Sequence, residues 1–103
     1  MSQHSFTENG ITVSLGYDRN LDCVFCTVSG SREGILYSNL GDLKAGTEQQ
    51  DVNYYRSILQ DLKIKVPETM FEQVAIDRQL RTGNRICLHD RLGWKALSDT
   101  EPL

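Results

Sequence analysis

The chain has 103 residues, a formal net charge of −3 and three cysteines. This length is enough for one domain with a buried core and too short for two. The charge argues against a general attraction to DNA, RNA or anionic lipid, and an odd cysteine count argues against a closed disulfide framework. Because we find neither a signal-peptide pattern nor a run of about 20 apolar residues, we expect a cytoplasmic protein.

Three strands are predicted in the first half of the chain. Residues 11–15 alternate apolar and polar side chains, which is the period of a strand with one face in water. Residues 21–28 are rich in β-branched and aromatic side chains and are apolar on both faces, and a short strand follows at 35–37. Turn-forming residues dominate the connections 16–20 and 29–34, so we expect an antiparallel meander.

Two amphipathic helices are predicted between residues 51 and 82. Asp51 suits the N-cap of the first helix, Pro67 the start of the second, and Gly83 its left-handed end. Apolar residues recur at three- and four-residue spacing, so each helix needs a surface to pack on. They are Val52, Tyr55, Leu59 and Leu62 in the first helix and Met70, Phe71, Val74 and Ala75 in the second.

A fourth strand is expected at 85–89, which gives the order β-β-β-α-α-β. The predicted fold is α+β: an antiparallel sheet of about four strands with two helices packed on one face. We expect a flexible N-terminus at 1–9, a single α+β domain at 10–90 and a weakly ordered C-terminal tail at 91–103.

The cysteines and one histidine provide an alternative reading as a zinc- or thiol-dependent protein. Cys23, Cys26, Cys87 and His89 have the number and type of ligands of a tetrahedral zinc site. However, Cys23 and Cys26 point to opposite faces of a regular strand, so chelation requires a bulge. We therefore expect no metal and no cofactor, with this zinc or thiol site as the alternative.

The sequence offers little support for catalysis or for DNA binding. His4 falls in the segment expected to be flexible, and Cys87 and His89 are same-face strand neighbours about 7 Å apart, which is too far for a nucleophile and its base. A helix-turn-helix reading of the helix pair is opposed by Glu68 and Glu72, which repel phosphates. We therefore expect that the protein is not an enzyme and has no catalytic residues.

The remaining interpretation is a small, non-catalytic accessory or regulatory protein that binds another protein or a second copy of itself. Tyrosine suits such contacts because it has an apolar body and a polar tip. Residues 1–51 contain seven acidic and three basic residues, so a second alternative is an acidic inhibitor of a nucleic-acid-handling enzyme. The expected partner-binding residues are Tyr17, Tyr37, Tyr54, Asp18, Asp22 and Asp42.

Overall fold

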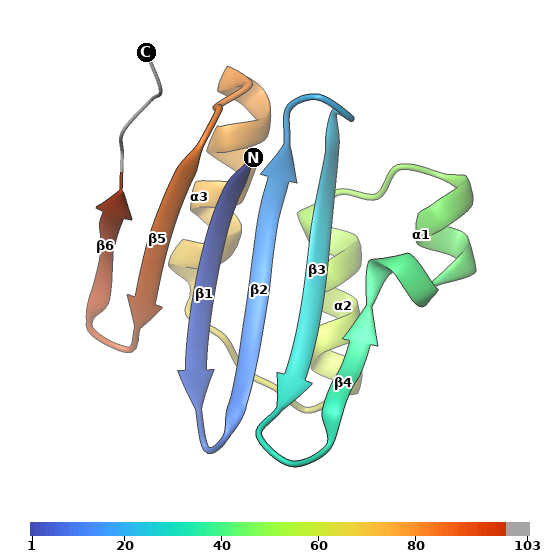
Figure 1. Cartoon of the computed structure of the whole chain (residues 1–103), viewed down its shortest axis with the longest axis vertical. Helices are drawn as coiled ribbons and strands as arrows, with labels where there is room; N and C mark the ends of the chain where they lie inside the picture. Colours follow the sequence, from blue (N-terminus) through green and yellow to red (C-terminus); the bar gives the residue numbers. More distant parts are fainter. Residues whose placement is uncertain (99–103) are drawn as a thin grey trace.

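A computed structural model describes residues 1–98, without the side chains of residues 46, 47 and 98. It shows an α+β fold in which two longer helices lie on one face of a six-stranded mixed sheet (Figure 1). The elements are β1 Ser2–Glu8, β2 Ile11–Asp18, β3 Cys23–Gly30, β4 Gly34–Ser38, the short 3-10 helix η1 Asn39–Gly41, α1 Leu43–Thr47, α2 Val52–Asp61, α3 Glu68–Leu80, β5 Arg85–Asp90 and β6 Gly93–Ser98.

The strand order is β4-β3-β2-β1-β5-β6. Strands β1 to β4 form an antiparallel meander, whereas β5 returns parallel to β1 and then pairs with β6 in an antiparallel hairpin. The predicted α+β class and helix pair are therefore confirmed, but the sheet has six strands and one parallel pair. Within the described residues no helix is long and apolar enough to cross a bilayer.

Both ends of the chain differ from the sequence prediction. Residues 2–8, expected to be flexible, form β1 near the centre of the sheet, hydrogen-bonded to β2 on one side and β5 on the other. Residues 93–98, expected in a weakly ordered tail, form β6, while residues 99–103 lie outside the described residues. A strand is recognised in a sequence by apolar residues at every second position. In β1 two of these inward positions are the polar residues Ser2 and His4, so the pattern is not visible.

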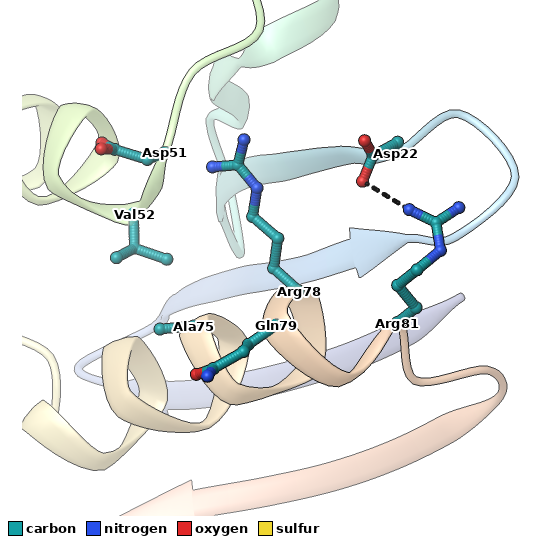
Figure 2. A pocket seen from close by; sticks show the side chains of 7 residues that line it. All are labelled: Asp22, Asp51, Val52, Ala75, Arg78, Gln79 and Arg81. Atoms are coloured by element: carbon teal, nitrogen blue, oxygen red, sulfur yellow. Dashed lines mark ion pairs between the residues drawn. The ribbon is translucent and has the colours of Figure 1, made fainter.

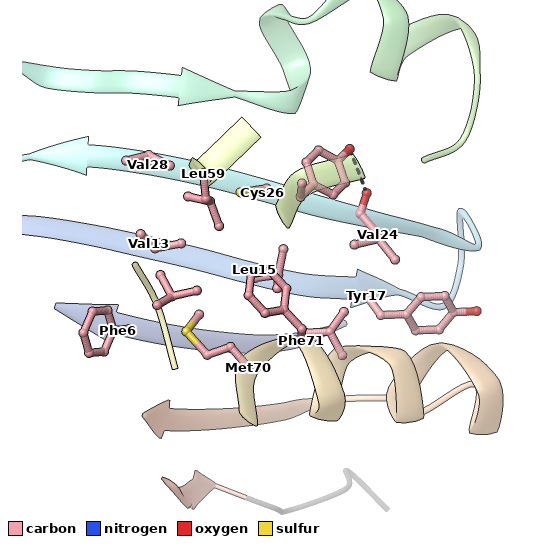
Figure 3. Packing of buried hydrophobic residues seen from close by; sticks show 13 residues of the cluster. Phe6, Val13, Leu15, Tyr17, Val24, Cys26, Val28, Leu59, Met70 and Phe71 are labelled. Carbon is pink, nitrogen blue, oxygen red and sulfur yellow. Dashed lines mark hydrogen bonds between the residues drawn. The ribbon is translucent and has the colours of Figure 1, made fainter. Parts of the chain in front are cut away.

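The hydrophobic core lies between the sheet and the helices (Figure 3). The predicted helix stripes supply much of it, since Tyr55 and Leu59 of α2 and Met70, Phe71 and Val74 of α3 are all buried. The sheet contributes Phe6, Val13, Leu15, Tyr17, Val24, Cys26 and Val28. The opposite face of the sheet is uncovered in the described part of the chain (Figure 1). It carries hydroxyl side chains such as those of Thr7 and Thr12.

The helix ends follow the predicted capping chemistry with one exception. Asp51 Oδ1 accepts hydrogen bonds from the amides of Asn53 and Tyr54, so it caps α2 as predicted. Pro67 immediately precedes α3. The left-handed residue that ends α3 is Arg81, with φ of 53°, instead of Gly83.

Candidate functional site

Four polar side chains form a continuous hydrogen-bonded chain between the sheet and α3. Thr69 Oγ1 lies 2.8 Å from His89 Nδ1, and His89 Nε2 lies 2.8 Å from His4 Nδ1. His4 Nε2 lies 2.7 Å from Asp77 Oδ2. His4 and Asp77 are fully buried and His89 is 5% exposed. We call these four residues the histidine relay.

The sheet register and the α3 stripe bring the relay together. His4 lies opposite Cys87 in the parallel β1–β5 pair, and His89 follows two residues later on the same inward face of β5. Asp77 lies seven residues after Met70 and three after Val74, on the stripe of α3 that faces the sheet. Elements from the beginning and the end of the chain thus meet over one helix.

Asp77 is a carboxylate with both oxygens occupied. Its Oδ1 accepts a 2.7 Å bond from Arg85 Nη1, and Arg85 Nη2 donates to Gln73 Oε1 at 2.8 Å. Burial acts to raise the pKa of Asp77, but hydrogen bonds from His4 and Ser2 and the nearby charges outweigh it, and the net pKa is lowered. The relay therefore ends on an anion in the interior.

His89 is neutral at pH 7. Burial, followed by the effects of His4 and Arg85, lowers its pKa to about 4. A carboxylate only accepts hydrogen bonds, so His4 donates through Nε2. When the second nitrogen of His4 carries no proton, it accepts from His89 Nε2–H, and His89 Nδ1 accepts from the Thr69 hydroxyl. Thr69, His89 and His4 then each donate toward Asp77, which only accepts.

Trp94 of β6 covers the outer side of the relay. Its ring stacks on His89 with centroids 5.8 Å apart and 19° between the planes, and the Arg85 guanidinium lies 5.0 Å from the Trp94 centroid. Thr69 is only partly buried. The relay therefore leads from the buried carboxylate to a residue that is only partly buried.

The sequence did not predict the relay, although two signals for it exist. Ser2, His4 and Phe6 alternate as inward residues of a strand would, and Asp77 continues the helical spacing of Met70. A charged residue on an apolar stripe indicates a buried partner. Thr69 carries no comparable signal.

Three of the predicted partner-binding residues come together where β4 and α1 meet α2. The hydroxyls of Tyr37 and Tyr54 each donate to Asp42 Oδ2 at 2.7 Å. These bonds, Tyr54 first, lower the pKa of Asp42, which also caps α1 by accepting from the amide of Lys44. The cluster joins the segment after β4 to α2.

The other three predicted residues gather at the turn between β2 and β3. Tyr17 is buried, and its hydroxyl donates to Asp22 Oδ1 at 2.6 Å. Asp22 also pairs with Arg81 at 3.2 Å, beside a crevice of about 470 Å³ between this turn and the helices (Figure 2). Asp18 accepts from the amides of Asn20 and Leu21. The carboxylates of Asp18 and Asp22 thus take part in hydrogen bonds and an ion pair within the chain.

The four candidate zinc ligands do not meet. Cys23 and Cys26 alternate on β3, with only Cys26 on the buried face, and β2 and β1 separate them from Cys87 and His89 on β5. No three histidine, cysteine or acidic residues in the described range are placed to hold a metal ion. Burial also raises the pKa of the Cys26 thiol to about 12, which suppresses thiolate chemistry there.

A group of large aliphatic side chains is exposed along the edge of the sheet formed by β4. Three of its members, Ile35, Leu36 and Leu43, line a hollow of about 660 Å³ between β4 and the start of α1. We call this group the β4-edge patch: Ile35, 68% exposed, Leu36, 41%, Leu40, 92%, and Leu43, 86%.

The chain matches no protein-family model, no curated protein and no solved structure. Its function is therefore inferred from the chemistry and placement of its own residues.

Proposed function

We propose that this protein is an accessory or regulatory protein that binds another protein through the β4-edge patch. The observation that supports the proposal is the exposure of four aliphatic side chains on β4 and on the short helices η1 and α1 that follow it. Contiguous apolar surface of this kind is typical of interaction sites on folded chains, whereas isolated exposed leucines are common.

The backbone of β4 adds a second reason. β4 is the last strand on its side of the sheet, so one of its edges pairs with β3 and the other has no strand beside it in the described chain (Figure 1). Its sequence, Gly-Ile-Leu-Tyr-Ser, contains neither a charge nor a proline, the residues that usually protect an edge strand. We infer that the partner supplies an extended segment that pairs with β4 and places apolar side chains on the patch.

The tyrosine–aspartate cluster supports this surface from beneath. Tyr37 and Tyr54 both bond to Asp42, so the segment that carries Leu40 is tied to α2. A surface held in this way loses little conformational freedom on binding, which favours affinity. In this proposal Asp42 and the two tyrosines position the patch.

The test compares wild type with the double variant Ile35→Lys plus Leu40→Lys. Both positions are exposed, so the fold should be retained while the apolar contact and edge pairing are lost. Leu92→Lys is the matched control, because Leu92 is 98% exposed in the turn between β5 and β6. A partner captured from native extract is purified, and its affinity for each variant is measured by calorimetry.

We expect the affinity to fall at least tenfold in the double variant and to be unchanged in the Leu92→Lys control. Equal affinity in all three proteins would contradict the proposal. Light scattering over a range of concentrations distinguishes a second copy from a different partner, since a patch-dependent dimer would show that the chain binds itself.

A further inference from the structure

We propose that the histidine relay makes Thr69 the nucleophile of an acyl-transfer site, with His89 as its general base. His4 and Asp77 are positioning residues in this site. The substrate class is the carboxylic ester. The inference concerns a different surface from the β4-edge patch and does not depend on partner binding.

The distances satisfy the geometric requirement of such a site. A hydroxyl nucleophile needs a base within hydrogen-bond reach and a further group that orients the base. The bond from Thr69 to His89 is 2.8 Å, and the bond from His89 to His4 is also 2.8 Å. His4 in turn is held by Asp77 at 2.7 Å. All the links are thus within hydrogen-bond distance in the resting protein.

Burial of the relay argues against a purely structural role. Placing an ionised carboxylate and two imidazoles inside a small core costs desolvation free energy that an apolar core avoids. Arg85 offsets part of the charge of Asp77. The relay nevertheless leads to Thr69, a residue that is only partly buried, and clusters of perturbed titratable groups are typical of functional sites.

The start of α3 supplies donors for the developing oxyanion. Thr69 is the second residue of this 13-residue helix, and Pro67 before it provides no side-chain cap. The Met70 amide already donates to the Pro67 carbonyl at 3.1 Å. The amides of Glu68 and Thr69, by contrast, have no acceptor within the helix and point toward its N-terminal end. Glu68 does not compete for them, since its carboxylate pairs with Arg56 at 2.7 Å. Such amides stabilise a tetrahedral intermediate.

The reaction balances with water as the only co-substrate. Thr69 Oγ1 forms a bond to the acyl carbon while its proton moves to His89 Nδ1. The resulting imidazolium is stabilised through His4 by Asp77. The carbon–oxygen bond of the ester then breaks, and the departing alcohol takes the proton from His89. Water next attacks the acyl-threonine with His89 again as base, which releases the carboxylic acid and restores the hydroxyl.

The experiment uses p-nitrophenyl acetate and the intact chain at pH 7. Release of p-nitrophenol is followed by absorbance, and the acetylated residue is located by mass spectrometry of peptides. Thr69→Val removes the hydroxyl with little change in shape, and Thr69→Ser retains it. Thr7→Val is the matched control, because the Thr7 hydroxyl bonds to that of Thr12 and not to a member of the relay in the described chain.

We expect acetylation of residue 69 in wild type and in Thr69→Ser. We expect release to be at least 100-fold slower in Thr69→Val and unchanged in Thr7→Val. The wild-type rate should be nearly constant from pH 6 to 8 because the base is neutral throughout, whereas attack by hydroxide rises about tenfold per pH unit.

Acetyl groups found only on lysines or on His89, or an unchanged rate in a folded Thr69→Val, would overturn the proposal. Circular dichroism and the urea midpoint establish whether Thr69→Val is folded. If it is not, the Thr69→Ser variant decides: its residue 69 must be acetylated for the proposal to stand.

Discussion

The Nδ1 atom of His4 lies 2.8 Å from Nε2 of His89, although 85 positions separate the two residues in the chain. The contact exists because β1 and β5 are parallel neighbours. Each ring is also bonded on its other nitrogen, His4 to Asp77 and His89 to Thr69. Stability and ionisation are therefore coupled in this part of the molecule, and four predictions concern this coupling and the packing around it.

Acid should destabilise the fold well above the pH at which carboxylates titrate. The pKa of His89 is about 4 in the folded protein against an ordinary value of 6.5, so between these values the unfolded chain binds more protons. The stabilisation that comes from the neutral His89 is fully present above pH 6.5. The free energy of unfolding should then fall by up to about 3 kcal/mol as the pH is lowered toward 4. Urea unfolding at pH 7, 6, 5 and 4 measures it. In His89→Gln the free energy of unfolding should depend less on pH. An equally steep pH dependence in that variant would show that another group causes the loss of stability.

Asp77→Asn should be strongly destabilising. Asparagine cannot accept both the His4 and the Arg85 bonds as the carboxylate does, and the Arg85 cation loses its partner. We expect a loss of about 2–4 kcal/mol in the free energy of unfolding. Asp61→Asn, at an exposed position of α2, is the control and should stay within about 0.5 kcal/mol. Similar values for the two variants would show that the buried bonds contribute little.

Removal of the Trp94 ring should shift the ionisation of His89. Trp94 stacks on His89, so Trp94→Ala admits water to the imidazole and raises its pKa from about 4 toward 6.5. NMR titration of the His89 ring protons measures the change. Trp94→Phe retains a stacked ring and should keep the low pKa, whereas the same titration curve in all three proteins would show that other groups shield His89.

Gly16→Ala should destabilise the sheet. A Cβ at position 16 collides with the backbone oxygen of Ser2 and with the ring of Phe25, and the Ser2 backbone cannot move without disturbing the β1–β2 pairing. We expect a loss of about 1–3 kcal/mol. Gly41→Ala is the control, because no atom lies within 4 Å of the added carbon, and it should change stability by less than about 0.5 kcal/mol. Thermal unfolding of both variants provides the comparison.

The helices were predictable from the sequence because their signals are local. The apolar spacing of Tyr55 and Leu59 and the cap at Asp51 depend on residues at most eight positions apart, and the structure retains both. The end of α3 was misplaced by two residues because Arg81 adopts a left-handed conformation that glycine usually occupies.

Unlike the helices, the relay and β1 could not be predicted from local sequence patterns. The inward positions of β1 include Ser2 and His4, and the two ring nitrogens of His4 are satisfied by residues far along the chain, His89 and Asp77. A pattern search scores such positions as solvent-exposed. Parallel pairing of β1 with β5 likewise depends on a long crossover that no local pattern specifies.

The parallel pairing of β1 with β5 also governs when the protein can fold during its synthesis. β1 leaves the ribosome before its neighbour β5, which is translated only after α3 is complete. Until then the nascent meander has one edge of β1 open and His4 lacks His89. Strands β5 and β6 therefore complete the sheet only after α3 has been translated, and a stalled translation product that ends at α3 presents that open edge to chaperones and to other nascent chains.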